Sequence, residues 1–467
     1  MTDSSTMQAE RSATSPDLAR RALAGGAASL AGLAAAELVA LVLPGSTSPT
    51  TAVAERVVEL TPDGPREALI GLVGTADKPL LVSGIVLVVV LVGALVAALA
   101  RPGKVPRAFA VGAALGWALT LGGSALDAVL GAVVVGTGYA VALGCWNLLS
   151  RGAVMPSSSA PAEGALERRE FLRATALVAA VGALGLGAAT VVRRTGARSL
   201  DAVRAAVRLP KPTSPAPPLP QGIQPAQPPM APAVTPNADF YQIDTALVTP
   251  VVGTDGWQLA IDGRVSSPLT LSYDDLLALP SIERTIALTC VSNEVGGDLV
   301  GTATWQGVRL ADLLERVGVR SDADALVGES VDGFTAGFPL SVLADGRDAM
   351  VAYAMNGEPL PVKHGFPARL VVPGLYGYVS ATKWLAAIRL TTLQETVPFW
   401  LERGWAADGT IELASRIDVP RTGAPVAPGR TTIGGRAWQQ HVGVDAVQVR
   451  IDGGPWEDAV LADSRRL

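Results

Sequence analysis

The sequence predicts a multi-domain fold in three parts: an N-terminal all-α transmembrane bundle, an α+β domain, and a short all-β domain of the immunoglobulin-like sandwich kind. The chain has 467 residues, more than one folding unit normally holds. Long apolar runs are confined to its N-terminal part, and a proline-rich stretch separates them from short apolar runs broken by glycine, proline and aspartate. The expected parts are a cytoplasmic tail (1–21), a membrane domain (22–192), a linker (193–236), the α+β domain (237–395) and the β-sandwich (396–467).

Composition and charge exclude several classes of function. Hydrophobic residues make up 49% and charged residues 17% of the chain, a balance that fits a membrane part joined to a soluble part. The net charge is −5 and basic residues occur only in small groups, so nucleic acid is not an expected partner. With only Cys145, Cys290, His364 and His441, a four-ligand zinc site would need every cysteine and histidine. A four-cysteine iron–sulfur cluster, and a haem held by two histidines of the membrane helices, are excluded.

Five stretches are apolar and long enough to cross a bilayer, which takes about 20 residues of helix: 22–43, 79–100, 108–126, 128–149 and 171–192. The third and fourth adjoin near Asp127, and their combined length fits a tight hairpin better than one long tilted helix. Clusters of Lys and Arg at 20–21, 101–107 and 151–169 flank the spans on one side, which the positive-inside rule makes cytoplasmic. Five crossings then place the chain after residue 192 outside.

Arg168 and Arg169, in the segment ERREFLR, precede the Ala- and Gly-rich run 174–192. This arrangement resembles an internal twin-arginine signal, which exports proteins that are already folded. Arg193, Arg194 and Arg198, just beyond the span, argue against an outside location of the following chain under the positive-inside rule. The alternative is an ordinary membrane anchor in which the arginine pair occurs by chance.

Glu37 is the clearest ionisable residue inside the spans. A carboxylate within a bilayer is a functional candidate, for example in an ion pathway. Because no cationic residue accompanies Glu37 in its span, we favour a contact with another helix or with the interface.

Prolines crowd residues 210–236, which favours an extended polyproline segment acting as a semi-rigid spacer. Beyond it, strands are expected at 257–265, 283–290, 325–331, 349–355 and 369–372. Helical spacing of apolar residues predicts helices at 273–278 and 308–317. Together these elements predict the mixed α+β domain.

Beyond residue 396 the sequence shows strand patterns only. They are expected at 431–437, 446–452 and 456–461, with a hairpin turn at Asp452-Gly453-Gly454. An immunoglobulin-like sandwich needs about seven strands. The domain is therefore expected to be truncated, lacking at least one closing strand and leaving an open edge beside 447–451.

The residues that carry chemistry lie in two segments. The first, LTCVSNEVGG at 288–297, places the Cys290 thiol at the end of a strand, in a polar, glycine-rich loop where a bound group can reach it. The second runs from MNGEPLP at 355–361 through HGFPARLVVPG at 364–374 to TKWL at 382–385. Taken alone, a cysteine at a strand end is more often a packed apolar residue, and a histidine before Gly-Phe-Pro is more often part of a turn.

The run from Met355 to Leu385 closely resembles the molybdopterin-binding stretch of the sulfite-oxidase family of molybdopterin-dependent oxidoreductases, and the Cys290 loop resembles that family's metal-ligand loop. The resemblance covers roughly residues 240–467, with several segments in the same order. It does not cover the membrane part, although the combination is similar to bacterial membrane-anchored members.

The resemblance implies a molybdenum–molybdopterin cofactor and two-electron oxygen-atom transfer at molybdenum on a small-molecule substrate. Together with the predicted spans and the basic residues beside them, it predicts a multi-pass protein of the bacterial cell membrane whose catalytic domain is extracytoplasmic. A separate electron carrier, a cytochrome or a quinone, would take or supply the electrons. The β-sandwich, of a dimerisation type, would favour a homodimer.

The family's site residues fall on matching positions of this sequence. Cys290 would ligate molybdenum, because a thiolate is a natural ligand for this soft-ligated metal. The cofactor's phosphate needs cationic and N–H donors, and the fork of an arginine matches its geometry. The residues implied for cofactor binding are Asn293, His364, Arg369 and Lys383, with backbone N–H groups of Ala381, Thr382 and Lys383. Trp405 stands where the family has a tyrosine near the metal, and is the second catalytic candidate after Cys290.

The sequence departs from the family beside the cysteine. Sulfite oxidases carry arginines just after the cysteine loop, whereas Glu294, Val295, Gly296 and Gly297 occupy that stretch here. A carboxylate repels sulfite at short range. The substrate is therefore open between a small sulfur or organic compound to be oxidised and an S-oxide or N-oxide to be reduced.

Two other functions are compatible with the same sequence. One is a cofactor-free, membrane-tethered binding or sensor module derived from the same fold, against which Cys290, His364 and Arg369 argue. The other is a transporter with an external sensor domain, indicated by Glu37 alone. The metal content of the purified protein separates the enzyme from both.

Overall fold

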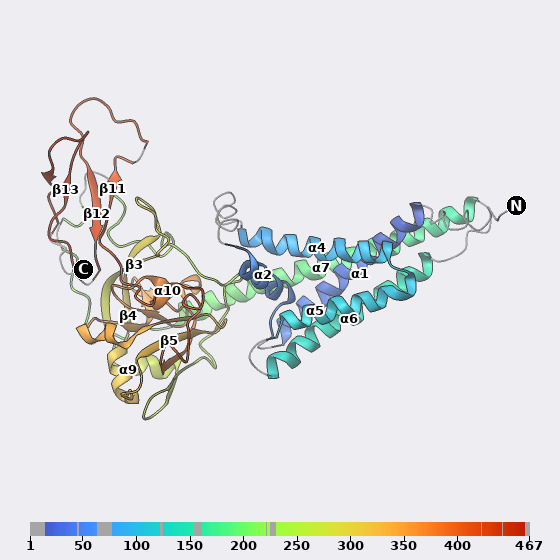
Figure 1. Ribbon diagram of the computed structural model, residues 1–467, viewed down its shortest axis with the longest axis horizontal. Coiled ribbons are helices and arrows are strands. Elements are labelled where there is room, and N and C mark those ends of the chain that lie inside the picture. The colour runs from blue at the N-terminus through green and yellow to red at the C-terminus, as the bar shows by residue number, and fades with distance from the viewer. Residues whose placement is uncertain are drawn as a thin grey trace. The chain divides into compact units, whose positions relative to one another are not determined.

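The computed structural model (Figure 1) describes residues 15–43, 46–62, 77–121, 125–153, 161–220, 222–224, 230–421, 423–440 and 442–462. The chain forms two compact units, the helical unit (Met1–Gly196) and the sheet unit (Ala197–Leu467). Residues 1–14 of the predicted tail and the last five residues of the predicted sandwich lie outside the described residues.

The helical unit is built around its first long helix. Its helices are α1 (Ser15–Val42), α2 (Pro49–Leu60), α4 (Asp77–Leu99), α5 (Val105–Leu119), α6 (Ala125–Ala153) and α7 (Pro161–Ala206), with the 3-10 turn η2 (Pro102–Lys104). Helix α1 packs against both α4 and α6. A Cβ at Gly32 of α1 would lie 2.6 Å from the carbonyl oxygen of Gly138 in α6, so only glycine permits this approach. Small residues at the contacts are typical of helices that pack in an apolar solvent.

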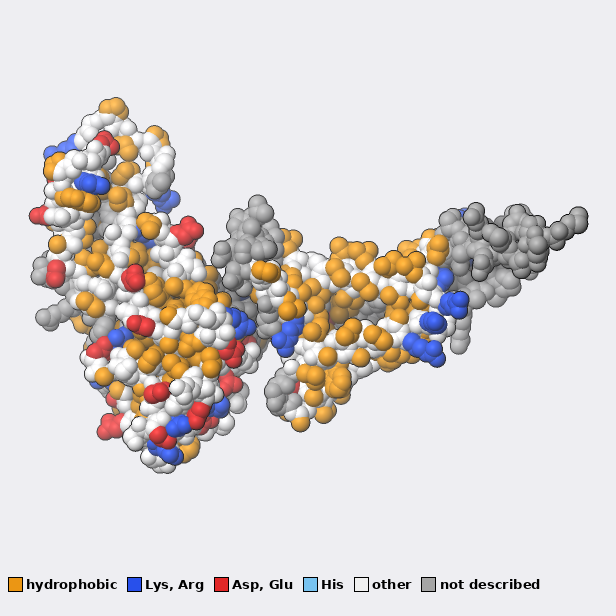
Figure 2. All heavy atoms as spheres, viewed as in Figure 1, with side chains coloured by type: hydrophobic (Ala, Val, Ile, Leu, Met, Phe, Trp, Pro, Cys, Tyr) orange, Lys and Arg blue, Asp and Glu red, His pale blue; other side chains and the backbone are white. Residues whose placement is uncertain are grey.

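Among the residues that the structure describes, four helices are long and apolar enough to cross a membrane: Leu18–Val42, Lys78–Leu99, Ala125–Ser150 and Arg168–Val192. The predicted third span, 108–126, is instead α5, whose 15 residues extend about 22 Å. Hydrophobic side chains cover much of the visible surface of the unit (Figure 2), and Leu87, Leu91 and Leu95 of α4 are each more than half exposed. Such a surface is consistent with membrane association.

Helix α2 was not predicted, and its N-terminal residues bind the Glu37 carboxylate. The Glu37 carboxylate is 2% exposed and accepts hydrogen bonds from Ser48 Oγ at 2.8 Å, Thr50 N–H at 2.9 Å and Thr50 Oγ1 at 2.7 Å. Ser48 is the N-cap of α2, so the carboxylate lies at the positive end of the helix dipole. Glu37 therefore joins α1 to α2, in line with the favoured contact with another helix.

Two sheets form the framework of the sheet unit. One has the strand order β2-β1-β10-β5-β6, and the other has the order β3-β4-β7-β8, with β9 pairing with β7. The bounds are β1 (Gln258–Gly263), β2 (Leu269–Ser272), β3 (Ile282–Thr289), β4 (Val300–Arg309), β5 (Ala325–Ser330), β6 (Thr335–Pro339), β7 (Met350–Met355), β8 (Glu358–Pro359), β9 (Arg369–Val371) and β10 (Leu385–Thr391). Strands β1 and β10 run parallel, and β3, β4 and β7 are antiparallel neighbours.

Short helices complete a sheet-rich domain, as predicted: α8 (Tyr273–Ala278), α9 (Leu310–Val317) and α10 (Gly377–Ser380), with the 3-10 turns η3 (Leu340–Asp345) and η4 (Val362–His364). Helix α9 buries Leu310, Leu313 and Val317 along one face. It begins later than predicted, because 308–309 complete β4. Every residue of β7 is buried, which explains its continuous apolar sequence.

The segment predicted as a linker, 193–236, contains helix and contacts a sheet. Helix α7 continues to Ala206, so the first part of this segment is helical. Further along, Ser214 forms a parallel bridge with Ile282 of β3, and Glu283 N–H donates to Ser214 O at 2.8 Å. Proline spacing favours extended backbone, and extended backbone can pair with the exposed edge of a sheet.

The immunoglobulin-like sandwich predicted for 396–467 is not confirmed. The described residues form two separate ladders, β11 (Ala414–Val419) with β12 (Gly434–Trp438), and β13 (Gln448–Val449) with β14 (Glu457–Asp458). The connection between β13 and β14 contains the predicted turn, with Asp452 and Gly453 at positive φ. Ile451 and Trp456 remain more than half exposed, so these apolar side chains are not buried between two sheets.

Candidate functional site

Cys290 follows β3 directly and begins a loop, the cysteine loop (290–299), that leads back into β4. Two hydrogen bonds close the base of the loop: Cys290 N–H donates to Leu299 O at 2.9 Å, and Leu299 N–H donates to Asn293 Oδ1 at 2.8 Å. The thiol is free and half-buried. A thiolate at this position suits a soft metal that brings further ligands with it.

Gly365 draws three of the predicted cofactor residues together, and we call His364, Arg369 and Lys383 the basic cluster. A Cβ at Gly365 would lie 3.0 Å from Lys383 Cβ and 3.1 Å from Arg369 Cβ, and its φ is +108°. Both the space and the backbone angle require glycine. The cluster therefore joins the end of η4, the start of β9 and the segment before β10 at one point.

Arg369 is a buried cation. Its side chain donates to His364 O at 3.1 Å and lies over the Trp305 ring, 5.0 Å from the centroid. Only 3% of the residue is exposed, and no carboxylate pairs with it among the described residues. Burial lowers the pKa of Arg369 to about 10. A charge kept here without an anion is costly, so the cluster fits an anionic group that arrives from outside.

The surroundings of His364 disfavour its charged form. Burial, followed by the positive charge of Arg369, lowers the pKa of His364 to about 4. Its Nε2 lies 3.1 Å from Asn237 O, which accepts a hydrogen bond from the Nε2–H tautomer. We predicted a cationic donor for phosphate; without a bound anion the lowered pKa of His364 favours the imidazole, which has one hydrogen-bond partner at Nε2.

Lys383 is held by a carboxylate that the sequence analysis missed. Its Nζ lies 2.9 Å from Asp244 Oδ2, and both side chains are about nine-tenths buried. The residues are far apart in the sequence, so no local pattern links them. Asp244 therefore fixes the position of the Lys383 ammonium within the basic cluster.

The segment around Phe240 runs across the basic cluster. The Phe240 ring packs edge-on against His364 at 5.6 Å and against Trp305 at 5.8 Å. Burial, and then the charge of Cys290, raise the pKa of the neighbouring Tyr241, while Arg369 acts in the opposite direction. Tyr241 therefore lies within electrostatic range of both the thiol and the buried guanidinium. The only sequence signal for this segment is its aromatic pair just after the prolines.

The other predicted cofactor residues are largely engaged in internal bonds. Ala381 N–H donates to Gly377 O at 3.0 Å. Thr382 is fully buried, and its hydroxyl donates to Gly328 O at 3.4 Å. Asn293 Oδ1 accepts from within the cysteine loop. The expected backbone donor at Ala381 is thus already used, and Asn293 supports the loop.

Trp405 belongs to an aromatic cluster. Its ring lies 5.1 Å from Tyr378 and 4.6 Å from Trp400. Tyr378 is part of α10, the helix that leads into Thr382 and Lys383. The structure therefore places Trp405 beside the segment that carries part of the basic cluster.

The sequence of this part of the chain is similar to that of known proteins. Residues 246–400 match the family described as the oxidoreductase molybdopterin binding domain. The uncharacterized oxidoreductase YuiH of Bacillus subtilis (strain 168) is 39% identical over 155 residues, which cover 33% of this chain and 74% of YuiH. Mitochondrial sulfite oxidase of Mus musculus is 32% identical over 271 residues, 49% of each chain. The chain thus spans about half the length of that sulfite oxidase.

Among solved structures, the sulfane dehydrogenase SoxCD from Paracoccus pantotrophus aligns with a TM-score of 0.43 and 26% identity, covering 49% of this chain and 66% of the other. The family match covers the segment that contains Cys290 and the basic cluster. Molybdopterin with molybdenum is the cofactor of this family. The chain belongs to the sulfite-oxidase family of molybdopterin-dependent oxidoreductases.

Proposed function

We propose that this chain is a membrane-anchored enzyme in which Cys290 ligates molybdenum and the basic cluster holds the phosphate of molybdopterin. Its reaction would be two-electron oxygen-atom transfer on a small molecule. The observation that carries the proposal is the buried guanidinium of Arg369, which pairs with no carboxylate among the described residues. A phosphate would remove the cost of that charge and match the arginine fork.

Bound in this site, the cofactor would supply the redox chemistry and the exchange of the oxygen atom. The chain's own task is to hold and shield it. Arg369 offers a planar fork backed by the Trp305 face, and Lys383 offers a charge fixed by Asp244. The neutral His364 offers a hydrogen bond, and a nearby anion would raise its pKa toward the ordinary range. The Phe240 ring packs against the imidazole, and His364 is only 1% exposed.

The cysteine loop would present the thiolate from the other side. We propose Trp405 as an aromatic wall of the substrate site, supported by its place beside α10. Glu294 and Val295 are exposed on the loop and bring no cation to the substrate. Sulfite is therefore proposed to be a poor substrate, because a carboxylate repels a dianion.

The membrane topology is proposed from the pairing of α5 with α6. Trp117 Nε1–H of α5 donates to Ala128 O at 2.8 Å near the start of α6, and Phe109 meets Trp146 at 6.3 Å near its end. The two helices thus form an antiparallel hairpin. We propose that α5 is a short fifth crossing, which keeps the basic clusters on the cytoplasmic side and the sheet unit outside.

The export signal is proposed from Arg168 and Arg169, both exposed on α7. Replacing both with Lys should keep the sheet unit in the cytoplasm while the preceding helices remain inserted, because twin-arginine export reads the arginines themselves. Protease added outside intact spheroplasts measures this. Unchanged cleavage of the sheet unit would show that the arginine pair is not the signal.

We propose a separate electron carrier, a cytochrome or a quinone, because the two cysteines and two histidines of this sequence cannot supply a four-cysteine iron–sulfur cluster, or a haem held by two histidines once His364 is assigned to the site. A homodimer through residues 396–467 is likewise proposed, and the exposed Ile451 and Trp456 support an interface there.

Metal analysis tests the central proposal. Protein expressed in a molybdenum-replete bacterium and purified in detergent should contain stoichiometric molybdenum and the pterin phosphate. Arg369→Met should lose most of both. Protein that folds and binds neither would instead be the cofactor-free binding or sensor module.

A further inference from the structure

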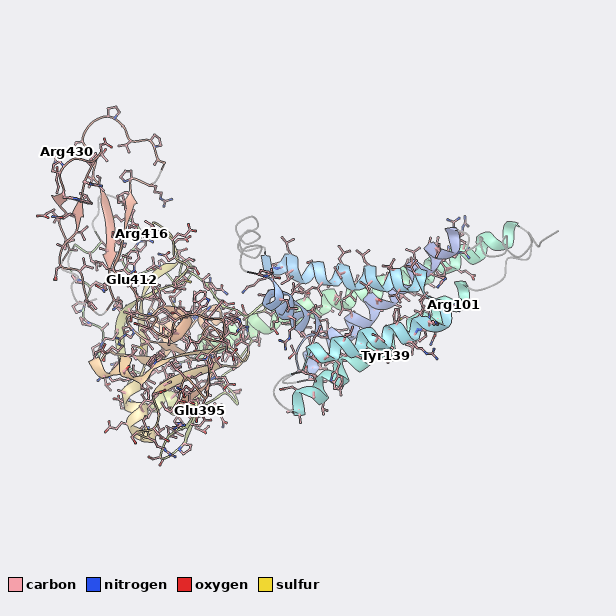
Figure 3. The ribbon with its side chains drawn as sticks, viewed as in Figure 1. Arg101, Tyr139, Glu395, Glu412, Arg416 and Arg430 are labelled. Carbon is pink, nitrogen blue, oxygen red and sulfur yellow. The ribbon has the colours of Figure 1, made fainter. Side chains whose placement is uncertain are left out.

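We propose that Arg416, on β11, is a positioning residue for the cysteine loop and through it for the metal-ligating thiolate. The inference rests on the proposed role of Cys290. Arg416 NH1 donates to Gly297 O at 3.0 Å, so a side chain from beyond residue 400 holds the loop that carries the cysteine. Figure 3 labels Arg416 on this ladder.

The cysteine loop has little other support. Its internal bonds run between Cys290, Asn293 and Leu299 at the base and between Gly297 N–H and Glu294 O. Val295 at the tip is fully exposed. Among the described residues, Arg416 is the one side chain from outside the loop that donates a hydrogen bond to it. The return path from the tip to β4 therefore depends on this contact.

Gly297, whose carbonyl accepts the hydrogen bond from Arg416, is closely packed within the loop. A Cβ at Gly297 would lie 2.8 Å from Asn293 Oδ1 and 2.9 Å from Glu294 O, so the residue packs tightly against the inner side of the loop. The position of Gly297 therefore restrains Asn293, and Asn293 N–H donates to Cys290 O at 3.0 Å. Three short steps connect the guanidinium to the cysteine backbone.

Arg416 is itself anchored. Its Nε lies 2.7 Å from Asp418 Oδ1, and the two side chains are 16% and 10% exposed. Arg436 of β12 approaches the other oxygen of Asp418 at 3.4 Å and also donates to Ala231 O. Arg416 bonds to Asp418 through Nε and to Gly297 O through NH1, two separate nitrogens of one planar group, whereas a lysine offers a single nitrogen.

The β11–β12 ladder contains an unfavourable pairing of two arginines. Arg416 and Arg436 are direct partners in the β11–β12 register, where like charges repel. Asp418 relieves the repulsion by pairing with both. Simple docking of the ladder does not need this arrangement, because Gln440 Oε1 already accepts from Ala287 N–H of β3 at 2.9 Å. Arg416 is therefore assigned to the loop rather than to docking alone.

The test uses the full-length protein in detergent with its own cofactor. Arg416→Gln removes the guanidinium that donates to Gly297 O. Gln440→Ala removes a docking contact that does not involve the loop, and Cys290→Ser removes the thiolate. Molybdenum content, thermal unfolding and the electron paramagnetic resonance spectrum of half-reduced molybdenum are measured for each. If the glutamine variant does not fold, Arg416→Lys replaces it, since lysine keeps the charge but offers one nitrogen in place of the two that bond Asp418 and Gly297 O.

We expect Arg416→Gln to retain molybdenum but to shift or broaden the resonance and to lower kcat by about tenfold, the scale for residues that orient a metal ligand. Gln440→Ala should leave the spectrum unchanged. An unaltered spectrum in Arg416→Gln, or equal shifts in both variants, would overturn the inference. If Cys290→Ser also leaves the spectrum unaltered, the failure belongs to the proposed ligand instead.

Discussion

The basic cluster and the cysteine loop are the two parts of the candidate site, and they differ in how they are held. His364 and Arg369 are 1% and 3% exposed and are fixed by the surrounding core. The cysteine loop lies at the surface, with Val295 fully exposed, and is held by hydrogen bonds at its base and by Arg416. Buried charge thus prepares one end for the cofactor, whereas restraint of a loop prepares the other.

This difference has an energetic consequence. The basic cluster lowers the stability of the protein until an anion arrives, because its charge is desolvated and Arg369 pairs with no carboxylate among the described residues. The cysteine loop carries no such penalty, since its thiol is small and half-buried. Cofactor binding should therefore stabilise the protein mainly through the cluster and set its reactivity mainly through the loop.

The largest effect is expected for Cys290→Ser. Turnover should be abolished while the fold and the phosphate contacts remain, because a hydroxyl is a poor replacement for a soft thiolate ligand. Activity with an artificial electron acceptor and thermal unfolding check this together. Turnover close to that of the unaltered protein would remove Cys290 from the site.

Arg369→Met should act on binding and not on the cofactor-free fold. We expect molybdenum content to fall by at least about tenfold, while the cofactor-free protein keeps its stability or gains up to about 2 kcal/mol. Chemical denaturation of the cofactor-free protein measures the stability, and metal analysis of the native protein measures the molybdenum content.

Arg347→Met is the matched control, since Arg347 is also a largely buried arginine but pairs with Asp345 at 2.6 Å. This variant should lose stability and keep its molybdenum. A loss of stability in Arg369→Met as large as in the control would contradict the idea of an uncompensated charge.

The stability of the cofactor-free protein should fall as the pH is lowered from about 6.5 to about 4. The pKa of His364 is about 4 in the folded state and 6.5 when unperturbed, so the unfolded state binds more protons in this window. The shift corresponds to about 3 kcal/mol. Denaturation across this range in the protein and in His364→Gln measures it, and equal slopes would rule out His364 as the source. Bound cofactor should flatten the slope.

The smallest effect is expected for Asp244→Asn. The amide can still accept a hydrogen bond from Lys383, but the ion pair is lost, so the cofactor-free protein should lose about 1–2 kcal/mol. Asp262→Asn breaks a more exposed pair with Arg389 and should change stability by less than about 1 kcal/mol. Similar changes in the two variants would show that burial does not strengthen the Asp244 pair.

The sequence predicted the elements whose apolar residues are contiguous. Strands β3, β5, β7 and β9 coincide with predicted runs because each carries a short apolar stretch, which in the fully buried β7 is unbroken. Strand β4 was missed, since Trp305 and Gln306 interrupt its pattern and Gly307 suggests a turn. Strand β11 was missed because Arg416 and Asp418 alternate with exposed residues, which resembles a loop.

For the site, proximity in sequence decided what could be predicted. His364 and Arg369 lie in one compact segment that resembles a known family, and the structure brings them together with Lys383 at Gly365. Asp244 and Arg416 contact the same site from segments more than a hundred residues away. Such contacts depend on tertiary packing, which one sequence does not reveal. The neutral state of His364 also depends on burial and could not be read from its residue type.

The pairing of Ser214 with β3 has a practical consequence for anyone who cuts the soluble part from its anchor. Strand β3 lies at the end of its sheet, and residues around Ser214 cover its outer edge. If a protease cleaves, or a cloned fragment begins, within the prolines after Ser214, this pairing is lost. The edge of β3, the strand that leads to Cys290, is then exposed and can pair with another chain. A fragment that begins before residue 207 keeps its own cover and should stay monodisperse, whereas one that begins after residue 216 should aggregate.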